Sequence, residues 1–500
     1  MKRTLLSLMA LVLTIAVEAQ TLNVKVGSVT YQFPASQTGE MTYQDGTTLT
    51  IMGKTFTLAD IDAMTVDDSE VVDGTIVVNY DGGSASVAVA GNIAQHVTPT
   101  VCGAHVSIAQ GSDLAEEITY TLSGTSSDGE FYMSGSYKAT IELNGLTLTN
   151  VTPVYSGAAV HIQNGKRIKV KVATGTTNTL VDAASGSQKG CLYIKGHAEF
   201  AQKGTLNITG NVKHGIKTGE YMTLKNATIN VTSAVKDGIS CNEYFLMESG
   251  TINISGVGDE GIQCEPDGDV STGETTDHED EDSGNIYIEG GTLTVSADTE
   301  GIESKGELRI TGGEVTVNAK DDAINAAGDL TISGGYVYAR STGNDGIDAN
   351  GNCYIKGGLV YAIGTSTPEV AIDANSEEQK KLYVTGGTII AIGGLESGAS
   401  LTQSCYSTSS WTKNVWYAIT VGSETIAFKT PSSGGSTLVV SGASQPTLKS
   451  GVTVSSGTSI FDGAAYTSAT VTGGSSVNLS SYSGGNGGGP GGPWGPGGWR

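Results

Sequence analysis

Basic residues are scarce in this sequence of 500 residues. It contains 27 Lys and Arg against 51 Asp and Glu, which gives a formal net charge of −24 at pH 7. Nucleic acids and anionic membranes are themselves negatively charged, so this balance excludes nucleic acid as an ordinary partner and disfavours anionic membranes. An acidic ligand would need a cation between itself and the protein.

Long apolar runs are missing after the N-terminus. No later run approaches the roughly 18 residues of a membrane-spanning helix, so we expect no membrane insertion. At the N-terminus, Lys2 and Arg3 precede an apolar run over residues 5–17 and a small-residue cleavage site, with no cysteine at that site for a lipid anchor. The pattern predicts a cleavable signal peptide over residues 1–19. We therefore expect an exported monomer that is secreted, held at the cell surface or periplasmic.

Cysteine is also rare, with six residues and no CxxC or Cys/His spacing of the kind that binds zinc. Cys353 takes the place of a leucine in its repeat and is expected to be a buried hydrophobe. Cys241 and Cys264 occupy one inward position in neighbouring repeats. Export permits a disulfide between them, but parallel stacking points both side chains the same way, which favours two thiols.

Glycine, in contrast, is abundant at 71 residues, and helix-favouring runs are few. Isoleucines in the middle of the chain recur at steps of 23, 23, 40, 22, 23 and 25 residues, and the long step contains an insertion of about one extra repeat. A fixed period of this length is typical of stacked supersecondary units. The recurring residues are Ile216, Ile239, Ile262, Ile302, Ile324, Ile347 and Ile372.

Each repeat reads as three short strands. The isoleucine is followed by an alternating segment such as residues 308–310, then by a Gly-Gly pair such as residues 312–313, then by a second alternating segment such as residues 315–317. Alternation with period two indicates strands, and glycines turn the corners between them. The repeats lack the leucine and asparagine spacing of leucine-rich repeats. The pattern therefore predicts an all-β chain built as a parallel β-helix of about 22–23 residues per coil.

The period also divides the chain. Residues 20–138 are rich in strands and turns but lack it, which indicates an N-terminal β module that caps the coils. Residues 139–398 are predicted to be the parallel β-helix. Residues 399–482 are expected to form degenerate coils or a β-rich C-terminal cap, and the Gly/Pro/Trp tail over residues 483–500 is expected to be flexible.

Acidic residues stand two places before five successive isoleucines. Stacked strands lie about 4.8 Å apart, so these side chains should form a column of like charges that recruits a counter-ion. One interpretation is a calcium site, because calcium accepts irregular cages of carboxylate oxygens. The other is that these acidic residues only form turns, since Asp-Gly is an ordinary turn sequence. Both interpretations stay open. The predicted calcium ligands, which include a second column on the outward side of the same strand, are Asp237, Asp259, Glu260, Glu300, Glu303, Asp321, Asp322, Asp345, Asp348 and Asp373.

An acidic insertion over residues 266–284 is either simply solvated or a calcium-ordered lid over the column; its spacing does not match an EF-hand. Tyr338 and Tyr361 occupy equivalent outward positions on successive coils, and Tyr336 lies on the same face. We predict that these three tyrosines form a carbohydrate-binding platform, since flat aromatic rings suit sugar rings. Such ladders also stabilise β-structures by themselves.

Several phrases resemble a known family. The segment over residues 214–240 (HGIKTGEYMTLKNATINVTSAVKDGIS) and the repeated DGI and LTISGG phrases resemble secreted bacterial carbohydrate-binding β-helix proteins, which bind cellulose and acidic sugars and are similar in fold to family 9 polysaccharide lyases. The resemblance covers about residues 139–400. It implies a right-handed parallel β-helix, bound Ca²⁺ at the acidic DGI positions, and plant polysaccharide ligands such as polygalacturonate or cellulose.

Three classes of function remain. We expect a calcium-dependent polysaccharide binder with no catalytic residues. A pectate-type lyase is the alternative, because it would need only a metal and a basic residue that removes the proton beside a uronate carboxylate. A surface adhesive or structural protein is the third class. The candidate bases beside the acidic column are Lys213, Lys217, Lys236, Lys305 and Lys320.

Overall fold

The computed structural model describes residues 20–268 and 282–484, and nearly all of their regular structure is β-strand. Only three short 3-10 helices occur in these ranges: η1 (Gly91–His96), η2 (Ser376–Glu378) and η3 (Phe461–Gly463). The predicted signal peptide, most of the tail and most of the acidic insertion lie outside the described residues. Within them, no helix is long and apolar enough to cross a bilayer.

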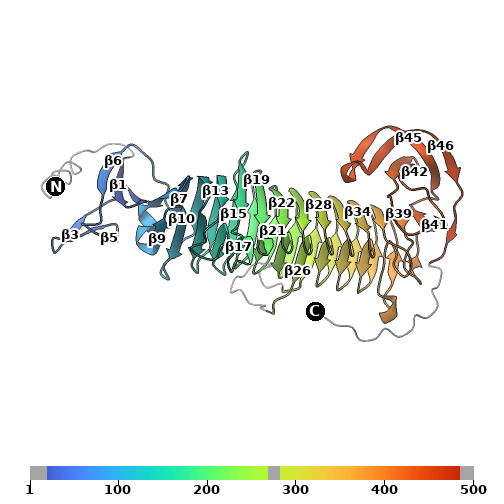
Figure 1. Ribbon diagram of the computed structural model, residues 1–500, viewed down its shortest axis with the longest axis horizontal. Coiled ribbons are helices and arrows are strands. Elements are labelled where there is room, and N and C mark those ends of the chain that lie inside the picture. Colours follow the sequence, from blue (N-terminus) through green and yellow to red (C-terminus); the bar gives the residue numbers. More distant parts are fainter. Residues whose placement is uncertain (1–19, 269–281, 485–500) are drawn as a thin grey trace.

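Large parallel sheets dominate the molecule, and the repeats follow one another along its long axis (Figure 1). The predicted all-β class with parallel pairing is thus confirmed. The 11-stranded sheet that carries the isoleucines, here called the isoleucine sheet, contains β9 (Val97–Cys102), β10 (His105–Gln110), β12 (Glu130–Ser134), β14 (Val160–Gln163), β17 (Gly190–Ile194), β20 (His214–Thr218), β23 (Ile239–Asn242), β26 (Ile262–Glu265), β29 (Ile302–Ser304), β32 (Ile324–Ala326) and β35 (Ile347–Ala349).

Two further rows of strands come from the same repeats, and each strand pairs in parallel with its equivalent in the next repeat. One row contains β15 (Ile168–Val172), β18 (Ala198–Ala201), β21 (Met222–Leu224), β24 (Tyr244–Met247), β27 (Asn285–Ile288), β30 (Leu308–Ile310), β33 (Leu330–Ile332), β36 (Cys353–Ile355), β38 (Leu382–Val384) and β40 (Ser400–Leu401). The other contains β16 (Thr177–Val181), β19 (Thr205–Gly210), β22 (Thr228–Ala234), β25 (Thr251–Val257), β28 (Thr292–Ala297), β31 (Glu314–Ala319), β34 (Tyr336–Ser341), β37 (Leu359–Ile363) and β39 (Thr388–Ile392).

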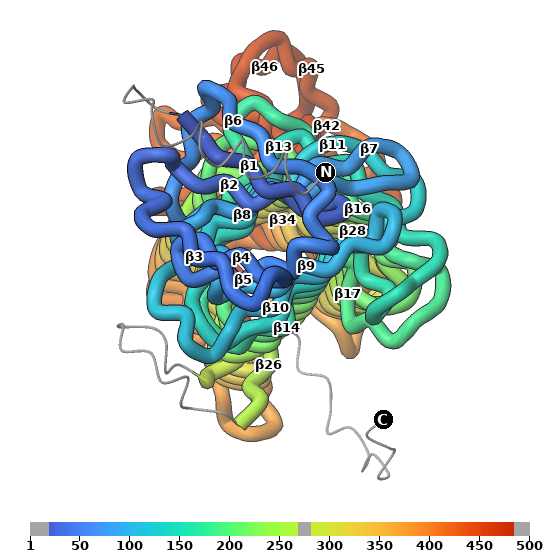
Figure 2. The backbone as a smooth tube through the Cα atoms, turned by 90° about the vertical axis from the view of Figure 1, so that its left-hand side faces the viewer, coloured from blue at the N-terminus to red at the C-terminus, as the bar shows by residue number. Residues whose placement is uncertain are grey.

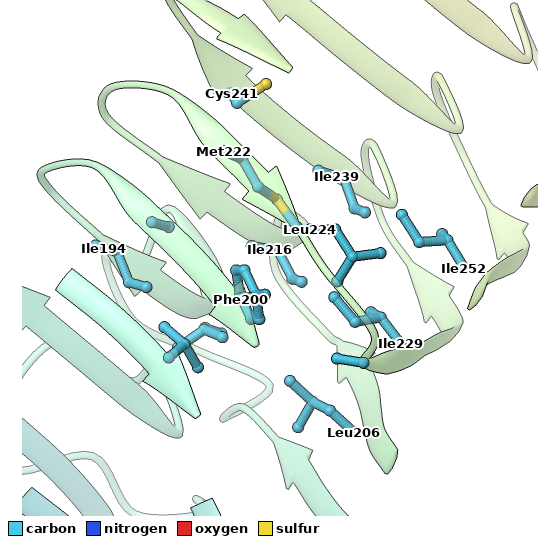
Figure 3. Close-up of a cluster of buried hydrophobic side chains, with 14 of the residues drawn as sticks. Ile194, Phe200, Leu206, Ile216, Met222, Leu224, Ile229, Ile239, Cys241 and Ile252 are labelled. Atoms are coloured by element: carbon cyan, nitrogen blue, oxygen red, sulfur yellow. The ribbon is translucent and has the colours of Figure 1, made fainter. Parts of the chain in front are cut away.

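The recurring isoleucines pair directly with one another from Ile216 to Ile372, and each is fully buried. The prediction of inward isoleucines in register is confirmed. Figure 3 shows part of this core, with the labelled side chains of Ile216 and Ile239 on neighbouring strands. Ile262 pairs with Ile302 across the 40-residue step, so β26 and β29 are direct neighbours in the sheet in spite of the longer spacing. Burying each such side chain stabilises the fold by about 1.5–3 kcal/mol.

The Gly-Gly pairs turn the corner between two rows. The second glycine of the pair lies in the left-handed region, as at Gly313 with φ +80° and Gly358 with φ +79°. At the first glycine the previous rung is very close: a Cβ on Gly312 would lie 2.2 Å from the carbonyl oxygen of Glu289. Glycine is therefore required twice at each of these corners.

The N-terminal part begins with antiparallel strands and joins the stack before residue 139. These strands are β1 (Thr21–Val26), β2 (Val29–Pro34), β3 (Thr42–Gln44), β4 (Thr48–Ile51), β5 (Lys54–Thr57), β6 (Ala63–Asp67), β7 (Thr75–Asp81) and β8 (Ser84–Ala90). Parallel pairing first occurs between β2 and β8, and it continues where β7 meets β11 (Ile118–Ser126) and where β10 meets β12. It passes through β13 (Ala139–Thr149), which pairs with both β15 and β16. Seen along the long axis, the successive turns of the chain lie behind one another (Figure 2).

The C-terminal part forms a closed four-stranded barrel of β42 (Trp416–Val421), β43 (Glu424–Lys429), β45 (Thr447–Ile460) and β46 (Ala465–Val477). Among the flanking strands, β41 (Cys405–Thr408) pairs with both β44 (Leu438–Ser441) and β47 (Ser480–Tyr482), and β44 also pairs with β39 of the stack. The barrel has its own apolar core, which is continuous with the outward side chains of β34, β37 and β39. It therefore covers one face of the last repeats.

Candidate functional site

The five acidic residues that precede the isoleucines form one continuous column. The backbone amide that follows each of these residues donates to the carbonyl oxygen of the next one: Gly238 to Glu260, Gly261 to Glu300, Gly301 to Asp322, and Ala323 to Asp345, at 3.0–3.2 Å. Parallel strands with this bonding keep equivalent side chains on one line. The predicted stacking is therefore present in the structure.

One end of the column holds a compact group of Asp237, Asp259 and Glu260, in which one oxygen of each lies within 4.8 Å of the others. Burial would raise the pKa of Asp237, but His214 has the larger effect and lowers it. Nδ1 of His214 lies 3.1 Å from Oδ2 of Asp237, and the hydrogen bond and charge of this histidine outweigh burial. Burial and the Asp237 charge raise the pKa of Glu260 to about 9. Lys236 binds Asp259 at 2.9 Å, so this end of the column already contains cationic partners.

The other end holds Asp345, Asp348 and Asp373, whose carboxylate oxygens also lie within 4.8 Å of one another. Asp345 comes from the column, whereas the other two come from the outward position that follows the isoleucine. Burial raises the pKa of Asp345 to about 8, and burial together with Glu396 raises that of Asp373 to about 11. Carboxyl groups that are buried together in this way either hold protons or require a cation.

Asp322 lies one rung before this group and is joined to it. Its Oδ1 accepts from the amide of Asp345 at 2.9 Å, and Asn325 Nδ2 lies 3.2 Å from its Oδ2 and 3.5 Å from Asp348 Oδ2. Burial and the nearby Asp348 charge raise the pKa of Asp322 to about 8. The amide of Asn325 thus connects two carboxylates that sequence spacing placed in separate columns.

The remaining predicted ligands lie in the columns but outside these two groups. Glu303 accepts from Lys305 at 2.5 Å and from Gln263 at 2.8 Å. Asp321 accepts from Asn344 at 2.8 Å, and burial raises the pKa of Glu300. The carboxylates in the middle of the columns therefore find their partners mainly in local hydrogen bonds and ion pairs.

The predicted exposed platform of three tyrosines is wrong for two of its members. Tyr361 is fully buried, its hydroxyl donates to the carbonyl oxygen of Lys429 at 2.9 Å, and its ring packs 5.4 Å from Phe428. Tyr338 is only 8% exposed and lies 5.6 Å from Phe461. The barrel covers both rings, which the period alone could not reveal. Tyr336 remains 40% exposed.

Another aromatic row was missed from the sequence. Tyr132, His161 and Tyr193 are successive partners on the outward face of the isoleucine sheet, and the ring of His161 lies 4.8 Å from each tyrosine. Tyr155 stacks on Tyr132 at 5.1 Å. Tyr193 directly follows Leu192, the partner of Ile216, so extending the period one rung upstream would have found it.

The aromatic row and the outward acidic positions belong to one line on the sheet. From Tyr193 the pairing continues through Lys217 to Ser240 and then to Gln263, and from there to the acidic half of the sheet. The complete line, here called the outward row, is Tyr132, His161, Tyr193, Lys217, Ser240, Gln263, Glu303, Asn325, Asp348 and Asp373. One face thus has aromatic rings at one end and carboxylates at the other; Tyr132 and His161 are partly exposed, whereas Tyr193 is only 7% exposed.

Cys241 and Cys264 are partners in the isoleucine sheet and are both free thiols, as parallel stacking predicted. Each Sγ lies 3.8 Å from a backbone carbonyl oxygen of a neighbouring strand. Cys353 is fully buried between Leu330 and Leu382, in agreement with its predicted apolar role. The thiols therefore belong to the core and not to the site.

Comparison with known proteins identifies the family. The family described as carbohydrate-binding domain-containing protein matches residues 103–303 and 282–463. A relative of the same description from Acetivibrio thermocellus is 27% identical over 109 residues, which is 20% of this chain and 37% of the relative. A solved structure of a polysaccharide lyase-like protein from C. thermocellum, a gadolinium derivative, aligns with 57% of this chain and 93% of its own at 20% identity and a TM-score of 0.36. Because the family match extends over well more than half of the sequence, this chain belongs to the carbohydrate-binding domain-containing proteins.

Proposed function

We propose that this protein is an exported, calcium-dependent binder of acidic polysaccharide of the polygalacturonate type. That the ligand is a carbohydrate is inferred from membership of the carbohydrate-binding family. The observation that carries the rest is the pair of carboxylate groups at the two ends of one column, each with three ligand oxygens within 4.8 Å. Exported polysaccharide binders meet their ligands outside the cell, in agreement with the predicted signal peptide.

The repeats are proposed to wind as a right-handed parallel β-helix. Three rows of parallel strands, with one strand of each row in every repeat, support this winding. Equivalent residues of successive coils then lie one inter-strand distance apart, about 4.8 Å. A rigid stack of this kind holds ligands from several coils in fixed relative positions without help from flexible loops.

Calcium is the cation that fits the carboxylate groups best. It takes six to eight oxygen ligands in irregular geometry, and three carboxylates from one group leave coordination positions for water and for the ligand. At a net charge of −24 the protein repels a polyuronate at long range. We therefore propose that bound Ca²⁺ at Asp345, Asp348 and Asp373 bridges to uronate carboxylates, with a second ion at Asp237, Asp259 and Glu260.

The aromatic half of the outward row is proposed to hold sugar rings by stacking, in place of the buried Tyr338 and Tyr361. Tyr132 and His161 are both partly exposed, and their rings lie 4.8 Å apart. An aromatic face tolerates neutral sugars such as those of cellulose as well as acidic ones. One extended chain lying along the row would meet the rings first and the calcium positions farther along.

Calcium binding at the column is tested by calorimetric titration of the metal-free protein. We expect wild type to bind Ca²⁺, and the double variant Asp348→Asn with Asp373→Asn to lose one class of site. The matched control is the exposed pair Asp60→Asn with Asp81→Asn, which should titrate like wild type. Equal calcium binding by all three proteins would remove the bridging proposal.

A lyase activity is the second candidate, and Lys217 favours it. Burial lowers the pKa of this lysine, which brings it nearer to the range of a general base. Its Nζ donates to Asn242 Oδ1 at 2.5 Å and lies 3.4 Å from Ser240 Oγ. Lys236 and Lys305 instead form ion pairs with acidic neighbours, and these raise their pKa values. Release of unsaturated uronate by wild type and its loss in Lys217→Gln would establish the lyase; no product from wild type leaves binding alone.

A further inference from the structure

Two glutamates occupy a corner position at which five other repeats have glycine; the repeats of β15 and β38 have Lys166 and Lys380 there. The position lies two residues before the paired Ala198, Met222, Phe245, Ile286, Leu308, Leu330 and Cys353. Five of these seven repeats place glycine there, and Glu220 and Glu243 stand in the other two. The glycines are Gly196, Gly284, Gly306, Gly328 and Gly351.

The geometry of this corner explains the glycines. A Cβ on Gly196 would lie 2.3 Å from the carbonyl oxygen of Lys166, and a Cβ on Gly306 would lie 2.2 Å from that of Ser283. Glu243 takes the position with φ +58°, a left-handed conformation that costs a non-glycine residue of order 1 kcal/mol. A conformation that local sequence preference disfavours is a reason to look for a role of the side chain.

The side chains converge on a histidine of the preceding repeat. His197, Glu220 and Glu243 each offer one ligand atom, and these three atoms lie within 4.8 Å of one another. His197 Nε2 is 3.3 Å from Glu243 Oε2, and both side chains are completely buried. Glu243 Oε2 also accepts from the amide of Tyr221 at 3.1 Å. Its Oε1 is buried and accepts from no N–H or O–H group of the described residues. The carboxyl groups of Glu220 and Glu243 lie within hydrogen-bonding reach of each other, so this buried pair requires either a shared proton or a bound cation.

We propose that His197, Glu220 and Glu243 form a structural site for a divalent transition metal of the zinc class. One imidazole nitrogen and two carboxylate oxygens are ordinary zinc ligands, whereas calcium prefers oxygen alone. Zinc bonds of about 2.0–2.1 Å in a tetrahedron place neighbouring ligand atoms about 3.3 Å apart, which matches the spacing of His197 Nε2 and Glu243 Oε2.

This site is separate from the acidic column. Asp237 precedes strand β23 and Glu243 follows it, so the two sites lie at opposite ends of the same strands. A bound ion would join the corners of three successive repeats, those of His197, Glu220 and Glu243, and neutralise two buried carboxylates. The proposal does not depend on the polysaccharide or on calcium.

The test uses the full mature protein, stripped of metal and then saturated with Ca²⁺ so that the acidic column is filled. Zn²⁺ alone is then titrated. We expect wild type to bind one equivalent of Zn²⁺ with a rise in thermal midpoint, and Glu243→Gln, which keeps the shape of the side chain, to weaken this binding at least tenfold. The matched control is Glu248→Gln, an exposed glutamate directly after β24 that pairs with Lys225, and it should bind like wild type.

Equal zinc binding by wild type and Glu243→Gln, or none by wild type, would overturn the proposal and indicate a proton shared by the two carboxyl groups. If Glu243→Gln does not fold, Glu220→Gln serves as the second variant, because Glu220 is only partly buried. It should weaken zinc binding in the same way, and unchanged binding in this variant would equally contradict the site.

Discussion

At the scale of single residues, the acidic column concentrates like charges in partly buried positions. Burial and neighbouring charges raise the pKa of Glu260 to about 9 and those of Asp322 and Asp345 to about 8. Each of these carboxyl groups ionises reluctantly in the absence of a cation. A bound divalent ion removes the repulsion and supplies the coordination that the carboxylates lack.

Calcium should therefore raise the thermal midpoint of wild type. A ligand that binds only the folded state stabilises it by RT ln(1 + [L]/Kd), about 2.7 kcal/mol at one hundred times Kd. Replacing both Asp322 and Asp345 with Ala should remove the part of this gain that comes from the ion at Asp345, Asp348 and Asp373, and should leave the part that comes from the second ion. Differential scanning calorimetry with calcium and with chelator measures it. An unchanged midpoint when wild type is chelated would mean that the column consists only of turn-forming residues.

Tyr132→Ala should lower retention on cellulose several-fold, because a stacked aromatic contact contributes about 0.5–1.5 kcal/mol. The matched control is Tyr354→Ala, which removes one ring of the Tyr354–Tyr383 pair, stacked at 5.0 Å on a different row of strands. A cellulose-binding isotherm measures both variants. Equal loss in the two variants, or loss only in the control, would move the sugar contact away from the outward row.

Asp182 belongs to none of the proposed metal sites and allows a test of how stability depends on pH. It is buried, its oxygens accept from Gln188 at 2.9 Å and from the amide of Asn211 at 2.6 Å, and burial raises its pKa. Between pH 3.8, the ordinary pKa of an aspartate, and the raised pKa, the folded state binds more protons than the unfolded state. The stability that Asp182 contributes is therefore greatest below this pH range and falls as the pH rises through it. The stability advantage of wild type over Asp182→Asn should thus be larger at pH 4 than at pH 7 in urea unfolding. An advantage that is independent of pH, or that grows with pH, would contradict the raised pKa.

At the scale of elements, the sequence period predicted the strands, their rows and the inward isoleucines, because each depends on local alternation and on stacking. The acidic column followed from the same register. The burial of Tyr338 and Tyr361 did not, since it is caused by the barrel over residues 416–477, which lies far along the chain and carries no period. The convergence of His197 with Glu220 and Glu243 was also missed, because two glutamates and one histidine do not form a repeat.

The corner glycines give a test at this scale. Gly358→Ala should destabilise the protein by about 1–2 kcal/mol, because φ is +79° and a Cβ would lie 2.7 Å from the carbonyl oxygen of Gly335. Gly83→Ala is the control: its φ lies outside the left-handed region, no atom lies within 4 Å of the added Cβ, and the change should be close to neutral. Urea midpoints compare the two. Equal midpoints would show that the Gly-Gly corners do not limit the stacking.

At the scale of the whole molecule, a long stack with a charge of −24 presents one outward row that passes from aromatic rings to carboxylates. Its long-range field opposes an acidic polymer, so attraction has to come from short-range contacts. Calcium at the acidic end and ring stacking at the aromatic end would act on one chain of sugars at several points. Such multivalent contact raises overall affinity without any single strong contact.

Retention on polygalacturonate with and without chelator tests calcium bridging most directly. Wild type is applied to polygalacturonate and to cellulose, first in calcium, then in chelator, then in calcium again. We predict that retention on polygalacturonate is lost in chelator and returns with calcium, whereas retention on cellulose changes less because cellulose has no carboxylates to bridge. Equal retention on polygalacturonate in both buffers would contradict the bridge, and retention on neither polymer would favour an adhesive or structural role instead.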